Sequence, residues 1–247
     1  MSLHLKLIND EISLQKMTLP SRYYYFDDNY IKLLTLGEGF FPNDKLFTKL
    51  ELTNSSLIIA SESAAKVYPS KDVFAINKFD ISLAQNSNLE FINDELIMFR
   101  GAKFIQFFNL DFDESCTFFC SEMMSSGRSY EEYDFSDLLM RNKFSKEGAV
   151  EYLECFDIEG AKLKDYSKRH GREEIFAKIY VKSNDNEMFA SVLSDMGVKA
   201  YEYTQNRAFI VIIICAGKIS HLKEEIYNIW ELYRKALGKK KFDLGKR

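Results

Sequence analysis

Hydrophobic and polar positions alternate along most of the first two thirds of the chain. From about Leu3 to Phe156, short apolar runs are separated by turns rich in Asn, Asp, Ser and Gly, and few stretches have a helical period. Residues 78–83, for example, alternate strictly between charged or hydroxyl side chains and large apolar ones, which is the period of a strand with one buried face. This region is therefore predicted to be mainly β.

Three segments of this region resemble one another: residues 52–59, 83–91 and 110–119. Each is an apolar run, a polar turn with a serine and a second apolar run, and the serines (Ser55, Ser87 and Ser115) recur about every 30 residues. A recurrence of this length suggests stacked strand pairs. The expected fold is mainly β, with a body that is either a two-sheet β-sandwich or an irregular β-helix.

The pattern changes in the C-terminal third, where two helices are predicted. The first runs from Glu187 to Met196, and the second is capped by Ser220 and ends at Gly238. Strands are predicted at residues 175–181 and 209–215.

The chain has no linker rich in Pro, Gly and Ser, so we expect a single domain over residues 1–247. Within it, a β-rich body (1–183) is followed by a mixed α/β part (184–247).

Composition and charge narrow the class of protein. With 46% apolar and 15% aromatic residues, the chain can bury a large core. A net charge of -4 argues against nucleic acid as a partner. The first ten residues lack the pattern of a secretory signal, and the longest apolar run, 208–216, is far shorter than the roughly 20 residues of a membrane helix. We therefore expect a cytoplasmic protein without a membrane partner, and a solvated, frayed C-terminal tail at Lys239, Lys240, Lys241, Lys246 and Arg247.

No catalytic residues are predicted. Neither GxxxxGK nor GxGxxG occurs, which excludes the common phosphate-binding loops, and a GxSxG elbow is absent as well. The chain has only three histidines, and its four cysteines are interpreted as reduced, buried thiols: Cys116, Cys120, Cys155 and Cys215. No cluster of soft or imidazole ligands is evident that would hold a transition metal tightly.

The remaining candidates for metal binding or acid/base chemistry are carboxylates: Asp44, Glu62, Glu90, Glu122, Glu131 and Glu132. Taken singly, each is more often a surface or salt-bridged acid. Sites built only from carboxylates bind divalent transition metals weakly, which suits transit better than storage. The alternative is a carboxylate-dependent hydrolase, for which Glu122 and Glu132 would have to lie about 5–10 Å apart across an open cleft. A structural adaptor without a metal path is a third hypothesis.

Several of these residues stand in segments that resemble the urease accessory protein family UreD/UreH. Residues 60–68 are similar to the family's Thr-Thr-Gln-Ala-Ala-Thr-Lys-Val-Tyr segment, and four positions match: Ala64, Lys66, Val67 and Tyr68. Glu122 followed by Gly127-Arg128 resembles a second pattern, and residues 89–102 and 230–238 resemble two others. Asp44 falls where the family has an Asp after a glycine-rich loop. The resemblance runs in order from about residue 20 to residue 238.

The resemblance implies a non-enzymatic scaffold with a two-sheet, β-helix-like fold. It implies as partners the urease apoprotein subunits and the accessory proteins UreF and UreG, of which UreG is a GTPase, and it leaves room for a homodimer within the complex. It also implies nickel in transit through the β body toward the urease active site, with no tightly bound cofactor. The expected transient nickel stations are Asp44, Glu62 and Glu122, and the residues expected to line the path or meet a partner are Lys66, Tyr68, Arg128 and Glu132.

This chain departs from the family pattern at two informative places. Glu62 stands where the family has a glutamine, and it is expected either to strengthen a metal station or to pair with Lys66. Glu132-Tyr133 stands where the family has Gly-Glu, so the role of Glu132 as the family's carboxylate is left open.

Overall fold

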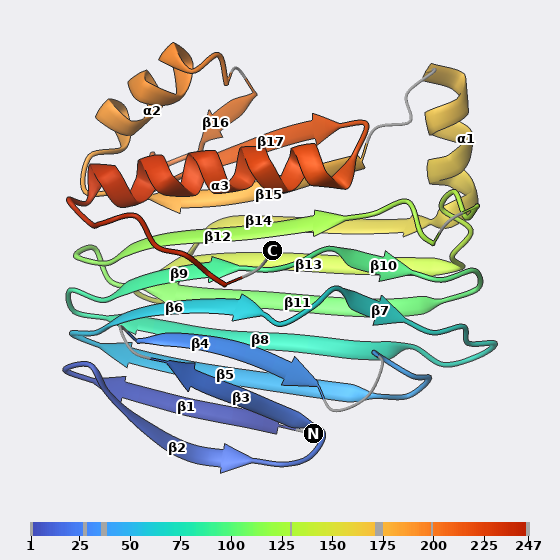
Figure 1. Ribbon diagram of the computed structural model, residues 1–247, viewed down its shortest axis with the longest axis horizontal. Coiled ribbons are helices and arrows are strands. Elements are labelled where there is room, and N and C mark those ends of the chain that lie inside the picture. The colour runs from blue at the N-terminus through green and yellow to red at the C-terminus, as the bar shows by residue number, and fades with distance from the viewer. Residues whose placement is uncertain are drawn as a thin grey trace.

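The protein is built from two stacked β-sheets with helices along one side (Figure 1). In the computed structural model, the described residues are 2–26, 29–35, 39–128, 130–170, 175–198 and 200–245. Within them lie seventeen strands and three helices. The first sheet has seven strands in the order β14-β13-β11-β8-β5-β1-β2. Their bounds are Ala149–Glu159, Asp137–Lys146, Lys103–Phe112, Ala75–Ala84, Lys45–Thr53, Ser2–Ile8 and Glu11–Met17.

The second sheet has the strand order β16-β17-β15-β12-β9-β6-β4-β3. Their bounds are Tyr201–Tyr203, Ile210–Ala216, Ile175–Lys182, Thr117–Met124, Asn88–Ile92, Ser56–Ser61, Tyr30–Thr35 and Ser21–Phe26. Two short strands, β7 (Ala65–Val67) and β10 (Leu96–Met98), pair with each other in parallel, and β10 also pairs with β12.

The repeated segments of the sequence form the turns of a β-helix-like body. In each, the chain leaves one sheet, turns and enters the other, as β5–β6, β8–β9 and β11–β12. Successive copies stack in parallel, and the turns are joined as well: Asn88 N donates to Ser55 O (2.9 Å), and Thr117 N donates to Ser87 O (3.0 Å). The mainly β fold class is confirmed.

The helices lie toward the C-terminal end. The two predicted ones are α2 (Asn186–Asp195) and α3 (Ile219–Ala236), and α3 runs across the outer face of the second sheet (Figure 1). Ser220 is not the cap of α3; Lys218 holds that position without a side-chain hydrogen bond. A third helix, α1 (Gly160–His170), was not predicted, because most of its residues are polar and few apolar side chains mark a buried face.

The apolar core forms three clusters. Two lie between the sheets and are separated along the strands, one around Leu50, Phe108 and Phe144 and the other around Phe104, Leu138 and Met124. The third lies under α2 and α3, on the outer face of the second sheet. The gap between the two interior clusters is where the polar residues discussed below gather.

The C-terminal tail is not frayed, contrary to expectation. Lys239 Nζ pairs with Glu90 Oε1 (2.9 Å), and Leu244 is buried, with its carbonyl accepting from Tyr30 Oη (2.8 Å). Glu90 is fully buried and also accepts from Arg234 Nη1 (2.6 Å) and Trp230 Nε1 (2.7 Å). A buried carboxylate needs such partners, so the tail and α3 are anchored together. Lys246 and Arg247 lie outside the described residues.

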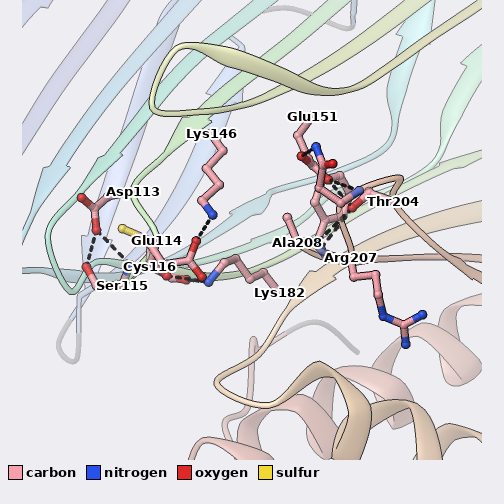
Figure 2. A network of polar contacts seen from close by, with 12 residues as sticks. Asp113, Glu114, Ser115, Cys116, Lys146, Glu151, Lys182, Thr204, Arg207 and Ala208 are labelled. Carbon is pink, nitrogen blue, oxygen red and sulfur yellow. Dashed lines mark hydrogen bonds and ion pairs between the residues drawn. The ribbon is translucent and has the colours of Figure 1, made fainter.

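Two groups of polar contacts join the sheets near β15 and β17 (Figure 2). In one, the buried Lys182 donates to the carbonyls of Glu114 (2.7 Å) and Cys116 (2.9 Å). In the other, Glu151 of β14 accepts from Thr204 Oγ1 (2.6 Å) and Asn206 Nδ2 (2.8 Å), which bridges the last strand of the first sheet to the loop before β17. Although burial opposes it, these hydrogen bonds lower the pKa of Glu151.

At the opposite end of the body, the edges of both sheets are open. The consecutive strands β2 and β3 are the outermost strands of the first and second sheet, and each pairs on one side only within the described residues. Large apolar side chains are exposed along them: Leu14, Met17, Leu19, Tyr24, Tyr25 and Phe26.

The interpretation of the four cysteines is half wrong. Cys116 and Cys120 are buried, but Cys155 and Cys215 are exposed. Cys155 lies on the outer face of β14, and Cys215 lies near the end of β17 on the face opposite the helices. No helix among the described residues is long and apolar enough to span a membrane.

Candidate functional site

Polar side chains occupy inward-facing positions on four adjacent strands of the first sheet. They are Thr48 (β5), Asn77 (β8), Gln106 (β11) and Asn142 (β13), and all four are buried. We call them the polar row. Asn77 and Gln106 are register partners, and Asn77 Nδ2 donates to Gln106 Oε1 (3.4 Å). The alternation that buries Phe79 and Phe108 buries these amides too, so the row runs between the two interior apolar clusters.

A cavity of about 260 Å³ lies along this row. Thr48, Asn77 and Gln106 line it from the first sheet, and residues 61–66 and Glu122 line it from the second. One water needs only about 10–15 Å³ of such space, so the cavity has room for a hydrated ion. Its lining is mixed, and the polar side chains in it can hydrogen-bond water, which a wholly apolar void cannot.

Glu122 lies at the inner end of the cavity. It stands on β12 at an inward-facing position, and its Oε1 accepts from Asn142 Nδ2 (2.7 Å) and from Tyr180 Oη (2.9 Å). Burial raises the pKa of Glu122, and nearby Lys178 together with these two hydrogen bonds opposes that rise. A carboxylate held by neutral donors in a low-dielectric interior attracts a cation strongly.

Glu62 lies at the outer end of the same cavity. Its Oε2 pairs with Lys32 Nζ (3.3 Å) and not with Lys66, so the expected Glu62–Lys66 pair is wrong. The reason is topological: β4, which carries Lys32, lies directly beside β6. Lys66 also lines the cavity, so the structure brings together three of the predicted site residues, Glu62, Lys66 and Glu122.

Three other predicted residues gather on the loops at one end of the body, outside the cavity. The ring of Tyr68 stacks on Phe41 (centroids 4.5 Å apart, planes at 8°) and meets Phe99 edge-on (5.1 Å). The guanidinium of Arg128 lies over Phe99, 4.1 Å from the ring centroid. Asp44 Oδ2 accepts from the backbone N of Phe41 (2.8 Å). We call Asp44, Phe41, Tyr68, Phe99 and Arg128 the end surface.

Glu131, not Glu132, is the structurally engaged acid of the following loop. Glu131 is buried and accepts from Arg128 Nη2 (3.0 Å) and from the backbone N of Arg100 (3.3 Å). Gly127 has a φ of +128°, and a Cβ there would lie 2.9 Å from Glu131 Cβ, so the loop requires glycine. Glu132 is exposed.

This arrangement does not provide the paired carboxylates of a hydrolase. Glu122 faces the interior cavity, whereas Glu132 is exposed on a loop and does not line that cavity. Among the described residues, no group of three or more His, Cys, Asp or Glu side chains converges as a metal site. The geometry offers separate carboxylates along one cavity.

Sequence reasoning missed the polar row, although a signal was present. Gln106 stands between Phe104 and Phe108 at an inward position, and Asn77 stands 29 residues earlier in the preceding repeat. A polar residue at the same inward position of successive copies is not needed for folding, because burying an amide costs free energy unless it is hydrogen-bonded. Comparing the copies position by position would have found the row.

Comparison with known proteins gives a consistent match. The family model described as "UreD urease accessory protein" matches residues 21–244. A protein of Aliarcobacter butzleri (strain RM4018) named "Urease accessory protein UreD" is 50% identical over 249 residues, which cover 100% of both chains. The protein of the same name from Bacillus sp. (strain TB-90) is 30% identical over 110 residues, covering 43% of this chain and 41% of its own.

Proposed function

This chain belongs to the UreD family of urease accessory proteins, and from that premise we propose that it delivers nickel to urease through its interior cavity. Glu62 at the outer end and Glu122 at the inner end would be transient stations for the ion. The observation that carries the proposal is that both carboxylates, far apart in the sequence, line one cavity between the sheets.

The chemistry of the lining suits passage. Carboxylate and amide oxygens bind Ni²⁺ less tightly than imidazole or thiolate groups do, so an ion held by them exchanges readily. The neutral amides Asn77 and Gln106 can hydrogen-bond the water shell of an ion without adding charge. Lys32 neutralises Glu62 until a cation replaces it.

The chain acts, in this proposal, as a non-catalytic cytoplasmic scaffold between the urease apoprotein and the accessory proteins UreF and UreG. The end surface is the proposed contact with a protein partner, because the exposed Phe41 and Arg128 and the half-buried Tyr68 are of the types that dominate protein interfaces. Asp44 belongs to this surface rather than to the cavity, and its carboxylate is engaged by the backbone of Phe41. It is therefore proposed as a partner residue and no longer as a nickel station.

The test is co-production of urease and its accessory proteins with either the natural chain or the Glu122→Gln variant. We expect the variant to assemble normally in a pull-down but to leave urease with several-fold less nickel, measured by elemental analysis. The matched control is Glu132→Gln, which removes an exposed carboxylate outside the cavity. Unchanged nickel with Glu122→Gln would remove Glu122 from the path.

A further inference from the structure

Beyond Glu122, the interior polar residues continue toward the opposite edge of the sheets. Tyr180 Oη lies 2.9 Å from Glu122 Oε1 and 3.1 Å from Glu154 Oε2, so one hydroxyl bridges two carboxylates. Glu154 is the register partner of Asn142 on β14, and Lys178 is the register partner of Glu122 on β15. The four strands β12, β13, β14 and β15 thus place these side chains in one group.

The group reaches solvent at Glu154. Its side chain is 25% exposed, and that of Lys178 is 11% exposed. Lys178 Nζ donates to Glu154 Oε1 (2.5 Å) and lies 5.7 Å and 5.8 Å from the ring centroids of Phe156 and Phe176. An ammonium between two rings and beside a carboxylate occupies a small, well-defined cation position.

A second observation at this place points to a ligand. Asn142 is 2% exposed, and its side-chain Nδ2 donates hydrogen bonds to Glu122 Oε1 and to Tyr180 Oη. Its Oδ1 is buried without a hydrogen-bond partner. Such an atom costs free energy in the folded state, and amide oxygens are ligands for hydrated divalent cations.

We propose that Glu154, which Tyr180 joins to the cavity-lining Glu122, is a further nickel station beyond the cavity, and that Lys178 is its gate. This inference rests on the proposed function. The Lys178 ammonium holds the carboxylate while no metal is present. A divalent cation passing Glu122 competes with the ammonium for Glu154, and the repulsion between the two cations prevents the metal from staying. Glu154 then releases the metal toward solvent or a docked partner.

The gate is tested with Lys178→Met, which keeps the length of the side chain and removes its charge. We expect the purified full chain to bind Ni²⁺ about three- to tenfold more tightly in calorimetric titration, because one nearby positive charge is gone. Urease made with this variant should contain less nickel, because release is slower. Weaker or unchanged Ni²⁺ binding by Lys178→Met would overturn the gate.

The station is tested with Glu154→Gln, which we expect to weaken Ni²⁺ binding and to lower the nickel content of urease several-fold. The matched controls are Lys78→Met and Asp80→Asn, which alter an ion pair on the outer face of the first sheet (2.7 Å). If a single variant fails to fold because one charge is left buried, the double variant Lys178→Met/Glu154→Gln removes both. It should fold and still deliver less nickel; delivery equal to that of the natural chain would exclude Glu154.

The two proposals can fail separately. If Glu122→Gln leaves urease fully loaded with nickel, the cavity is not the path and the proposed function fails. If Glu122→Gln lowers the nickel content but the variants at Glu154 and Lys178 behave like the natural chain, the path exists and leaves by another exit.

Discussion

The interior cavity and the end surface differ in how their residues are held. The cavity is lined mainly by strand residues whose direction is fixed by the alternation of the sheet, and the polar row along it is buried. The end surface stands on loops, and its side chains hold one another by stacking: Phe41 on Tyr68, and Arg128 on Phe99. Rigid strand positions suit an ion that must meet fixed oxygens. Mutually stacked side chains that include the exposed Phe41 and Arg128 suit contact with another protein.

The two regions also differ in how far their polar groups are exposed to water. Removing an amide from water without full compensation costs about 1–3 kcal/mol, so the polar row has a cost that the apolar core must offset. The end surface keeps the charged part of Arg128 in contact with water, with a side chain that is 57% exposed. The interior therefore places its polar groups where folding alone would place apolar ones.

The largest effect is expected from a substitution that destabilises the fold and so impairs both regions together. Arg234→Ala leaves the fully buried Glu90 carboxylate without its guanidinium partner (2.6 Å), and removing one member of a buried ion pair costs about 3–5 kcal/mol. We expect chemical denaturation to show this loss, followed by loss of both nickel delivery and partner binding. A stable variant that retains both activities would contradict the anchoring role of Glu90.

The next-largest effect is expected from a variant that alters the end surface and leaves the cavity intact. Arg128→Ala with Phe41→Ala removes the two ends of the stack, and hot-spot truncations of this kind cost about 2 kcal/mol in binding, or roughly 30-fold in Kd. Affinity for the urease complex should fall by that amount in a surface-binding assay. Ni²⁺ binding by the purified chain should be unchanged, because neither residue lines the cavity. A parallel loss of Ni²⁺ binding would join the two regions functionally.

The reverse experiment isolates the interior. Asn77→Leu with Gln106→Leu replaces both partners of a hydrogen bond by apolar groups, which is nearly neutral or stabilising for the fold. We expect a melting temperature equal to or above that of the natural chain, intact pull-down of partners, and urease with markedly less nickel. Full nickel loading would show that the polar row has no role in delivery.

The smallest effect is a pH dependence of the link between the sheets. Because the hydrogen bonds from Thr204 and Asn206 lower the pKa of Glu151, its ionised form is favoured in the folded state. The contribution of ionised Glu151 to the stability of the fold is present above the ordinary pKa of 4.5 and is lost as the pH falls below that value. The free energy of unfolding should therefore fall less between pH 7 and pH 4 in Glu151→Gln. Identical pH profiles would show that the Glu151 link does not contribute.

Much of the fold could be predicted from the sequence because its signals are local. The alternation at residues 78–83 predicts a strand, and the three serine turns predict the repeats of the β-helix-like body. The apolar stripes of α2 and α3 predict helices. Helix α1 was missed because most of its residues are polar and few apolar side chains mark a buried face. The C-terminal tail was misjudged because the buried acid that holds Lys239 is contributed by a strand 149 residues away.

The candidate site was predictable in its carboxylates and Lys66, but not in its polar row and not in how its residues are grouped. Glu62 and Glu122 belong to the carboxylates that the sequence singles out, and the resemblance to the UreD/UreH family adds Lys66, Tyr68 and Arg128. Two of these residues come into contact only if they lie on the same side of their strands and if successive repeats stack in the right register. No single segment of the sequence determines that stacking. Lys32 as the partner of Glu62, and Glu154 beyond Tyr180, emerge only when neighbouring strands are placed side by side.

The open edges formed by β2 and β3 have a consequence for stoichiometry in the cell. An edge strand with unpaired backbone groups and exposed Leu14, Tyr24 and Phe26 is a template to which another strand can add. Contacts between such edges need not close into a symmetric pair, so growth can continue without limit. A partner that covers the edge ends this growth. We therefore expect the soluble yield of this chain to follow the supply of its partner, and any excess to precipitate.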